Sequence, residues 1–215
     1  MRQEPYTDAR ARMVRTQIEA RGVADRRVLA AMATVPRHRF VAPGLAPQAY
    51  DDRPLPIGHG QTISQPYIVA YMTELLSLTP GARVLEVGTG CGYQAAVAAE
   101  IARQVYTIEI VKALADTART TLADLGYTNI SVRHGDGYGG WPDQAPFDGI
   151  VVAAAPDHVP PALVAQLAMG ARLVLPVGDQ HQEIRVITRT VGGHREERLI
   201  PVRFVPLTRD VREQD

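Results

Sequence analysis

The chain has 215 residues with 23 basic and 23 acidic side chains, so its formal net charge is zero. Hydrophobic residues make up 46% and charged residues 21%, which is typical of a globular protein and argues against a mainly disordered or fibrous chain. A balanced charge gives no broad electrostatic attraction to nucleic acid or to an anionic membrane. No apolar run reaches the roughly 18 residues of a membrane span. We therefore expect neither nucleic acid nor membrane as a partner.

The cysteine count and the N-terminal segment bear on the compartment. Cys91 is the only cysteine and cannot form an internal disulfide, which favours a reducing compartment. The N-terminal segment MRQEPYTDAR is polar and lacks the apolar stretch of a secretory signal. We expect a cytoplasmic monomer whose single domain spans residues 1–215.

The first 60 residues predict short helices and then irregular chain. Val14 and Ile18 are four residues apart, and Val28, Leu29 and Met32 repeat this helical spacing until Pro36 ends it. Five prolines between positions 36 and 56 exclude a long helix there, so this stretch is expected to be a loop.

Residues 61–180 alternate between helical and strand patterns. A helix is expected to begin at Pro66 and to end at Pro80-Gly81. Further helices are expected at 92–102, 114–125 and 159–167, and strands at 83–87, 105–109, 130–134, 147–153 and 172–176. Strands that alternate with helices indicate parallel βαβ units, so we predict an α/β fold with a doubly wound, mostly parallel sheet.

Residues 181–215 change character. The segments at 183–190 and 198–205 have a strand pattern with no helix between them. They predict an antiparallel hairpin that closes one edge of the sheet.

A glycine-rich loop follows the first predicted strand of the βα core. It contains Gly88, Gly90 and Gly92, and glycines there allow a sharp turn and a close approach of the backbone to a ligand. Glu109 ends the next strand, where a carboxylate can accept hydrogen bonds from ribose hydroxyls. Ligands of open α/β sheets bind beyond the carboxyl ends of the strands, so a ribose-bearing ligand is expected.

The spacing of the glycines separates two classes of cofactor. The dinucleotide fingerprint G-x-G-x-x-G would place its third glycine at Tyr93, where a large side chain obstructs close packing of helix and strand. The observed G-x-G-x-G, preceded by Glu86, resembles S-adenosylmethionine-dependent methyltransferases. An NAD-dependent dehydrogenase and a non-catalytic binding module remain as alternatives.

Asp136, in the segment HGDGYGGW, follows the third strand at the same edge of the sheet. It can accept a hydrogen bond from an adenine amine, or it can be an Asx-turn residue in a surface loop. The fourth strand ends in Ala-Ala-Ala-Pro and lacks the Asn- or Asp-Pro-Pro-aromatic motif of amine methyltransferases. The six histidines are scattered, so no metal site is expected.

Two hydroxyl side chains, Thr62 and Ser64, precede the helix that begins at Pro66. From the spacing alone, Ser64 is a candidate for binding substrate or for capping the helix. Both interpretations stay open at this level.

The segments LPIGHGQTISQPY, VLEVGTGCGY, RHGDG, APFDGIVVAAAP, LVLPVG and RFVPLT together resemble the bacterial type of the protein-L-isoaspartate O-methyltransferase family, from about residue 8 to Thr208. The resemblance implies a Rossmann-like fold with extra N-terminal helices. It implies methyl transfer from S-adenosylmethionine to the α-carboxyl of L-isoaspartyl residues in damaged proteins, which starts their repair through a succinimide. It also implies that Ser64 is the active-site residue, with Thr62 beside it. The cofactor contacts that it implies are Thr62, Ile63, Ser64, Gly88, Gly90, Glu109, Asp136, Gly137 and Thr208.

The sequence departs from the family pattern at two places. Cys91 stands where many relatives have serine, which leaves a thiol that is open to oxidation, and Gly170-Ala171 replaces a usual Gly-Gly pair. An α-carboxyl has a pKa of roughly 3.5 and is already ionised at neutral pH, so the expected reaction needs alignment more than a general base. A methyltransferase that acts on another carboxylate remains the nearest alternative.

Overall fold

The structure, a computed structural model, describes residues 6–209. The first five residues of the polar N-terminal segment, on which the predicted absence of a secretory signal partly rests, lie outside the described residues. Between residues 6 and 209, no helix is long and apolar enough to cross a membrane.

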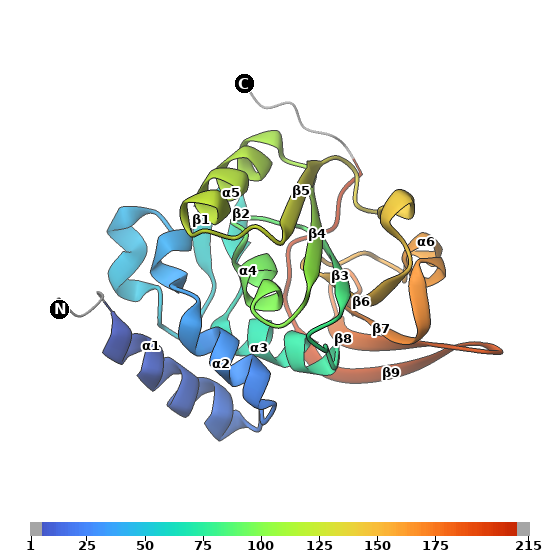
Figure 1. The fold of residues 1–215 in the computed structure, drawn as a ribbon, viewed down its shortest axis with the longest axis horizontal. Coiled ribbons are helices and arrows are strands. Elements are labelled where there is room, and N and C mark those ends of the chain that lie inside the picture. The colour runs from blue at the N-terminus through green and yellow to red at the C-terminus, as the bar shows by residue number, and fades with distance from the viewer. Residues whose placement is uncertain (1–5, 210–215) are drawn as a thin grey trace.

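A seven-stranded sheet forms the centre of the molecule, in the order β5-β4-β3-β6-β7-β8-β9 (Figure 1). Its strands are β3 (Arg83–Val87), β4 (Gln104–Glu109), β5 (Ile130–His134), β6 (Phe147–Val152), β7 (Leu167–Val177), β8 (Gln182–Thr190) and β9 (Gly193–Val202). The pairs from β5 to β7 are parallel, and β8 and β9 add to β7 as antiparallel strands. The predicted doubly wound sheet with an antiparallel hairpin at one edge is therefore confirmed.

The strand order places a crevice above β3. The chain runs outward from β3 to β4 and β5 and then crosses back to β6 on the other side of β3. Such a reversal of strand order leaves open space at the carboxyl ends of the strands, because the connections on its two sides leave in opposite directions.

The helices that pack on the sheet are α3 (Pro66–Leu75), α4 (Tyr93–Ala99), α5 (Lys112–Asp124) and α6 (Pro161–Ala165). The N-terminal helices are α1 (Thr7–Met13) and α2 (Arg26–Thr34). Neighbouring side chains of β3 enter different cores, as the two-residue period of a strand requires. Val84 belongs to the cluster that includes Met72 of α3, whereas Leu85 belongs to the cluster that includes Leu163 of α6.

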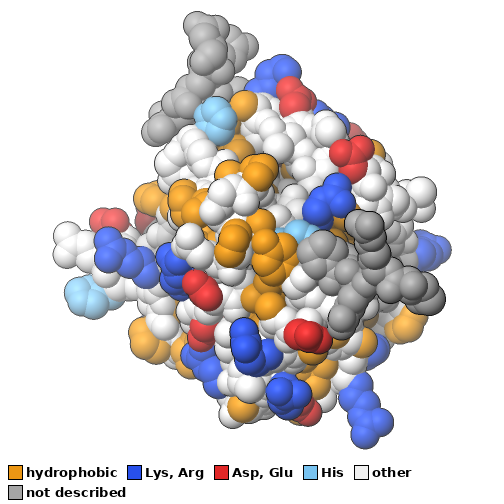
Figure 2. Space-filling view, turned by 90° about the vertical axis from the view of Figure 1, so that its left-hand side faces the viewer, with side chains coloured by type: hydrophobic (Ala, Val, Ile, Leu, Met, Phe, Trp, Pro, Cys, Tyr) orange, Lys and Arg blue, Asp and Glu red, His pale blue; other side chains and the backbone are white. Residues whose placement is uncertain are grey.

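The N-terminal helices pack on α3 and α4, on the side of the molecule away from the β8–β9 hairpin (Figure 1). The first helix continues beyond α1 through a π turn and a 3-10 turn to Gly22, whose φ of 97° ends it. Met13, Ile18 and Met32 are fully buried and belong to the core beneath α3. Figure 2 shows this side of the molecule, where basic and acidic side chains are interspersed around a band of hydrophobic ones. The predicted N-terminal helical extension is confirmed.

The stretch from Pro36 to Pro56, predicted to be a loop, contains more structure than expected. It has 3-10 turns at Arg37–Phe40 and Pro43–Gln48, and it ends in the first strand of a small hairpin. This hairpin pairs β1 (Leu55–Gly58) with β2 (Gln61–Ile63). Strands of four and three residues are too short to show a two-residue period, so the sequence pattern did not reveal them.

Three elements near the C-terminus have bounds other than those predicted. The helix expected at 159–167 spans only Pro161–Ala165, and the strand after it is longer than 172–176 because it begins at Leu167. A register shift between β6 and β7 lets the strand continue through Gly170. The last strand was expected at 198–205, but β9 begins at Gly193 and ends at Val202.

Candidate active site

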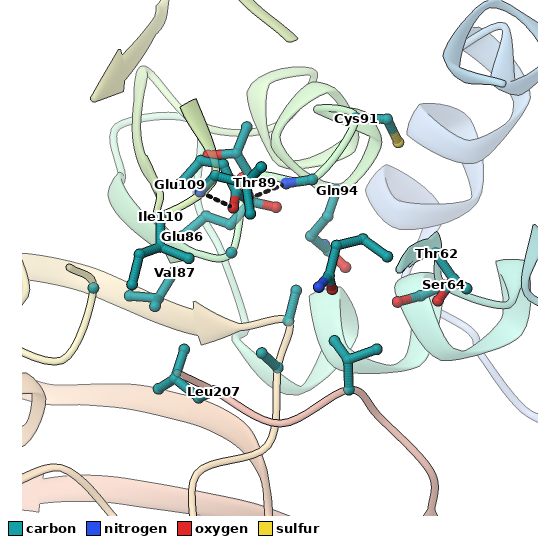
Figure 3. A pocket seen from close by; sticks show the side chains of 18 of the residues that line it. Thr62, Ser64, Glu86, Val87, Thr89, Cys91, Gln94, Glu109, Ile110 and Leu207 are labelled. Atoms are coloured by element: carbon teal, nitrogen blue, oxygen red, sulfur yellow. Dashed lines mark hydrogen bonds between the residues drawn. The ribbon is translucent and has the colours of Figure 1, made fainter. Parts of the chain in front are cut away.

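A cavity of about 260 Å³ lies at the carboxyl ends of β3, β4 and β6 (Figure 3). It is bounded by the β1–β2 hairpin, the glycine loop, the loop after β5 and the segment after β9. Among the residues implied by the family resemblance, its lining includes Thr62, Ile63, Ser64, Gly88, Gly90, Glu109, Gly137 and Thr208. The fold therefore brings together, from five separate segments, all but one of the residues that the resemblance implied.

The glycine loop turns sharply over the end of β3. Gly88, Gly90 and Gly92 have φ values of 90°, 53° and 91°, a region in which side chains other than glycine are strained. Gly92 is also the residue before α4, and a Cβ there would lie 3.2 Å from Leu122. The three glycines therefore fix the path of the backbone that faces the cavity.

Tyr93 is the first residue of α4 and is fully buried. Its ring meets the ring of Phe40 edge-on at 5.5 Å, and the guanidinium of Arg37 lies 4.8 Å from its centre. A large aromatic side chain therefore occupies the position where the dinucleotide fingerprint needs its third glycine. This packing argues against the dehydrogenase alternative.

Glu109 holds the glycine loop to the end of β4. Its Oε2 accepts a hydrogen bond of 2.7 Å from the backbone N–H of Gly90, and its Oε1 accepts one of 2.9 Å from the N–H of Val111. A carboxylate has about four lone-pair sites, so roughly two remain for a ligand. Glu109 therefore supports the loop, and its contact with ribose hydroxyls stays a prediction.

Glu86 lies deeper in the same cavity and is fully buried. Thr107 Oγ1 donates a 2.5 Å hydrogen bond to its Oε2, and Thr89 Oγ1 lies 2.6 Å from Thr107 Oγ1. Its Oε1 has no hydrogen-bond partner among the described residues. Burial, with a smaller contribution from the charge of Glu109, raises the pKa of Glu86 to about 8. A buried acid oxygen without a partner is costly, so this oxygen is available to a polar or cationic ligand.

The loop after β5 contributes its backbone rather than a side chain. A Cβ at Gly137 would lie 2.3 Å from Cγ1 of Val87, so only glycine fits without a shift of neighbouring atoms. Oδ1 of Asp136 accepts a 2.8 Å hydrogen bond from the backbone N–H of Tyr138. This is the Asx turn that the sequence analysis gave as the alternative to a cofactor contact. Asp136 is not among the residues that line the cavity. Its contact with the cofactor stays a prediction.

Thr62 and Ser64 lie at the end of the cavity opposite Glu86 and Glu109, with their hydroxyl oxygens close together (Figure 3). Gln65, not Ser64, is the residue before α3, and no side chain caps that helix. Neither hydroxyl bonds another side chain or backbone group within residues 6–209. The capping alternative for Ser64 therefore does not describe this structure, and both hydroxyls remain available to a substrate.

The two departures from the family pattern have small structural consequences. Cys91 lines the cavity, and burial of its thiol raises the pKa of Cys91 to about 11. Oxidation proceeds through the thiolate, so the thiol reacts slowly at neutral pH. Gly170 lies within β7 with a φ of 78°, and Ala171 follows it in the strand.

Several lining residues were not predicted as site residues: Glu86, Thr89, Gln94, Ile110, Val205, Pro206 and Leu207. Glu86 could have been found from the sequence, because it is the only charged residue in the buried part of β3, which is otherwise apolar. Gln94 lies on α4, and the others come from backbone turns and from the segment after β9, in which Pro206 pairs with Ala155. Their local sequence gives no sign of this position.

The residues present fit a nucleoside cofactor that also carries a positive charge. Glu109 offers acceptors for hydroxyls, the glycine loop and Gly137 allow close approach, and the partnerless oxygen of Glu86 can accept a bond from a cationic group. Among residues 6–209, no lysine or arginine lines this cavity. Groups of three or more histidine, cysteine, aspartate or glutamate side chains that could hold a metal ion are absent from the described part of the chain.

Comparisons with known proteins agree with this geometry. A family model described as protein-L-isoaspartate(D-aspartate) O-methyltransferase matches residues 8–212. A protein-L-isoaspartate O-methyltransferase of Gloeobacter violaceus is 60% identical over 200 residues, which cover 92% of this chain and 98% of that protein. The one of a Picosynechococcus species is 57% identical over 204 residues, which cover 95% and 92%.

Solved structures match over nearly the same range. A protein-L-isoaspartate O-methyltransferase superposes with a TM-score of 0.85 at 27% identity, over 94% of this chain and 67% of that one. A Plasmodium falciparum structure described as a protein-L-isoaspartate O-methyltransferase, in complex with S-adenosyl-L-homocysteine, gives 0.80 at 26% identity, over 94% and 99%. The chain therefore belongs to the protein-L-isoaspartate O-methyltransferase family.

Proposed function

We propose that this protein binds S-adenosylmethionine in the cavity above β3 and β4 and transfers its methyl group to the α-carboxylate of L-isoaspartyl residues. Proteins of this family methylate isoaspartyl residues in damaged proteins. The observation that best supports the proposal is the pair of hydroxyls, Thr62 and Ser64, that face the cavity without partners, opposite the acidic end formed by Glu86 and Glu109.

The acidic end is suited to the cofactor. Glu109 would accept hydrogen bonds from the ribose hydroxyls, while Gly88, Gly90 and Gly137 let the backbone approach the nucleoside closely. Oδ1 of Asp136 is used by its Asx turn. We propose that the other carboxylate oxygen, Oδ2, accepts a hydrogen bond from the adenine amine. When bound, S-adenosylmethionine supplies an electrophilic methyl group on a positively charged sulfur.

The hydroxyl end is suited to the substrate. With a pKa of roughly 3.5, the acceptor carboxylate is ionised at neutral pH and needs no general base. Ser64 and Thr62 would donate hydrogen bonds to one carboxylate oxygen and so direct the other toward the methyl group, with the reacting atoms about 3–3.5 Å apart. No lysine or arginine of the described chain lines the cavity, so none of these residues would lower the nucleophilicity of the attacking oxygen.

Methylation prepares the substrate for a spontaneous step. In the ester, the backbone nitrogen that follows the isoaspartyl residue attacks the ester carbonyl, and methanol leaves as the succinimide ring closes. Hydrolysis of the ring then opens either of its two C–N bonds and returns part of the material as normal aspartate. The protein is needed only for the first transfer.

The reaction class is tested by the chemical stability of the product. The enzyme is incubated with S-adenosylmethionine labelled in its methyl group and an isoaspartyl peptide, and the product is brought to mildly alkaline pH. A carboxyl methyl ester should release its label as volatile methanol. Label that stays on the peptide would show an amine acceptor and reject the proposed reaction.

The remaining expectations concern the protein as a whole. We propose a single domain over residues 1–215, a monomer in solution and a cytoplasmic location. The single cysteine supports a reducing compartment. Light scattering coupled to size exclusion gives the mass of the particle, which for a monomer is 23.4 kDa.

A further inference from the structure

A second cavity, which we call the flanking groove, opens beside the first and encloses about 310 Å³. Thr62, Ser64 and Ala153 line both cavities, so the groove begins where the acceptor carboxylate is proposed to lie. Its walls come from Arg21, from the chain before α3 and the first turn of that helix, and from the end of β9 with the residues that follow it. A substrate polypeptide held at Ser64 can therefore continue into this groove without leaving the protein surface.

About half of the groove wall is apolar, and Ile68 and Phe204 are among its apolar side chains. The two charged residues of the described range 6–209 that line it, Arg21 and Arg203, are both basic, and no carboxylate of that range lines it. The adjoining active-site cavity is lined by no lysine or arginine from the part of the chain that the structure describes. The positive charge thus lies beside the reacting position and outside it, where neighbouring residues of a substrate would pass.

Arg21 is held in place from two sides. Its guanidinium lies 3.5 Å from the centre of the Tyr67 ring, and its Nη1 donates a 2.7 Å hydrogen bond to Oδ2 of Asp52. Tyr67 is itself stacked on Tyr71, with ring centres 5.7 Å apart. A guanidinium has five N–H donors, and within residues 6–209 only the bond to Asp52 uses one. The other N–H groups of the Arg21 guanidinium are held in a fixed geometry in which they can donate hydrogen bonds to a carboxylate.

Arg203 is exposed and has no ion pair or hydrogen bond through its side chain to any residue in the described range 6–209. Asp52 partly neutralises Arg21, whereas nothing in that range neutralises Arg203. The groove therefore carries a net positive charge that a bound carboxylate can offset.

We propose that the flanking groove receives the substrate residue next to the isoaspartate and that Arg21 and Arg203 make the enzyme prefer an aspartate or glutamate side chain there. This inference rests on the proposed function, because the groove starts at the residues that are proposed to orient the acceptor. Each contact is an exposed or half-exposed ion pair, so its effect on specificity is modest and depends on salt.

The test uses isoaspartyl peptides that are blocked at both ends, so that only side chains differ in charge. Four positions are tested: the two residues before the isoaspartate and the two residues after it. At each position in turn, three peptides carry Glu, Gln or Lys, and the rest of the sequence is unchanged. At one position, kcat/KM should decrease from Glu to Gln to Lys by about threefold to fivefold per step, the size expected of an exposed ion pair. At 0.5 M salt the differences should shrink.

The variant Arg203→Glu should reverse the order at that same position, so that the Lys peptide becomes the better substrate. The Arg203 side chain makes no hydrogen bond or ion pair with residues 6–209, so the melting temperature of the variant should be unchanged. Arg195→Glu is the matched control, because it makes the same charge change near the other end of β9, where Arg195 pairs with Glu197. It should leave the order Glu, Gln, Lys intact.

Two results would overturn the inference. One is the absence of any charge preference at all four positions in the unmodified enzyme. The other is a loss of kcat/KM by the same factor for all three peptides in Arg203→Glu, which would mean that the arginine acts on the acceptor carboxylate itself or through the overall charge. If no isoaspartyl peptide is methylated at all, the proposed function fails instead.

Discussion

Thr107 Oγ1 donates a hydrogen bond of 2.5 Å to Oε2 of Glu86, and this bond joins β4 to β3 at the cavity that Glu86 lines. Both side chains are fully buried, and the other carboxylate oxygen of Glu86 has no partner within residues 6–209. Glu86 is thus held in position by one neighbour while its second oxygen stays available to a ligand. The Glu86 carboxyl is therefore an ionisable group whose buried environment favours its neutral, protonated form.

Glu86→Gln should change how stability depends on pH. The folded-state pKa of about 8 lies above the ordinary value of 4.5, so the folded state binds more protons than the unfolded state between these pH values. The free energy of unfolding of the unmodified protein should therefore fall, relative to that of the variant, by about 1.4 kcal/mol per pH unit from about pH 5 to 8.

Thermal unfolding without cofactor, at pH 5.5, 7 and 8.5, measures this difference. The variant should gain melting temperature over the unmodified protein as pH rises, with the largest gap at pH 8.5. Thr107→Val is the companion variant, because it removes the hydroxyl that stabilises the ionised form. A gap between unmodified protein and Glu86→Gln that does not vary with pH would show that Glu86 titrates normally.

Glu109→Ala should weaken cofactor binding. The ribose hydroxyls lose a charged acceptor, and Gly90 loses the bond that fixes the glycine loop. Hydrogen bonds to a charged group contribute about 1.5–3 kcal/mol, so the affinity for S-adenosylhomocysteine should fall roughly tenfold to hundredfold. Calorimetry checks this directly, and Glu100→Ala, outside the cavity on the far end of α4, is the control. An unchanged dissociation constant would remove Glu109 from the site.

Gly137→Ala should disturb the cavity floor through steric crowding alone. The new methyl group would lie 2.3 Å from Cγ1 of Val87, and overpacking of this kind costs about 1–3 kcal/mol. A lower melting temperature and weaker binding of S-adenosylhomocysteine are expected together. Gly139→Ala is the matched control, because nothing lies within 4 Å of a Cβ at that position. Equal behaviour of the two variants would contradict the assigned role of Gly137.

Ser64→Ala separates orientation of the acceptor from support of α3. Because Gln65 precedes the helix and no side chain caps it, the melting temperature should hardly change. Loss of a hydrogen bond to a charged acceptor should lower kcat/KM for an isoaspartyl peptide by about tenfold to hundredfold, with cofactor affinity much less affected. Ser64→Thr should restore part of the activity, since its hydroxyl is retained on a stiffer side chain. A stability loss that accounts for all of the lost activity would make Ser64 structural.

The sequence predicts the central sheet well because its strands are buried and regularly spaced. Arg83–Val87 and Ile130–His134 begin and end where the apolar pattern predicts. The prediction from sequence fails where an element depends on pairing between segments that are distant in the chain. The β1–β2 hairpin is too short to show a period, and the extension of β7 to Leu167 depends on contacts with β6.

The same distinction holds for the site. Glu109 and the glycines were predicted because strand ends and turns leave a local signal, and the structure places them in the cavity. Ser64 was ambiguous in the sequence until the residue before α3 proved to be Gln65. Leu207 and the rest of the segment after β9 reach the cavity only through tertiary contacts, which no local pattern encodes.

The central claim is methyl transfer to the carboxylate of an isoaspartyl residue, and paired peptides test it most directly. Two peptides with the same sequence, one with L-isoaspartate and one with L-aspartate at a single position, are incubated with the enzyme and methyl-labelled S-adenosylmethionine. The account predicts base-labile label on the isoaspartyl peptide and none above background on the aspartyl peptide. Equal labelling of both peptides, or of neither while S-adenosylmethionine binds, would contradict it.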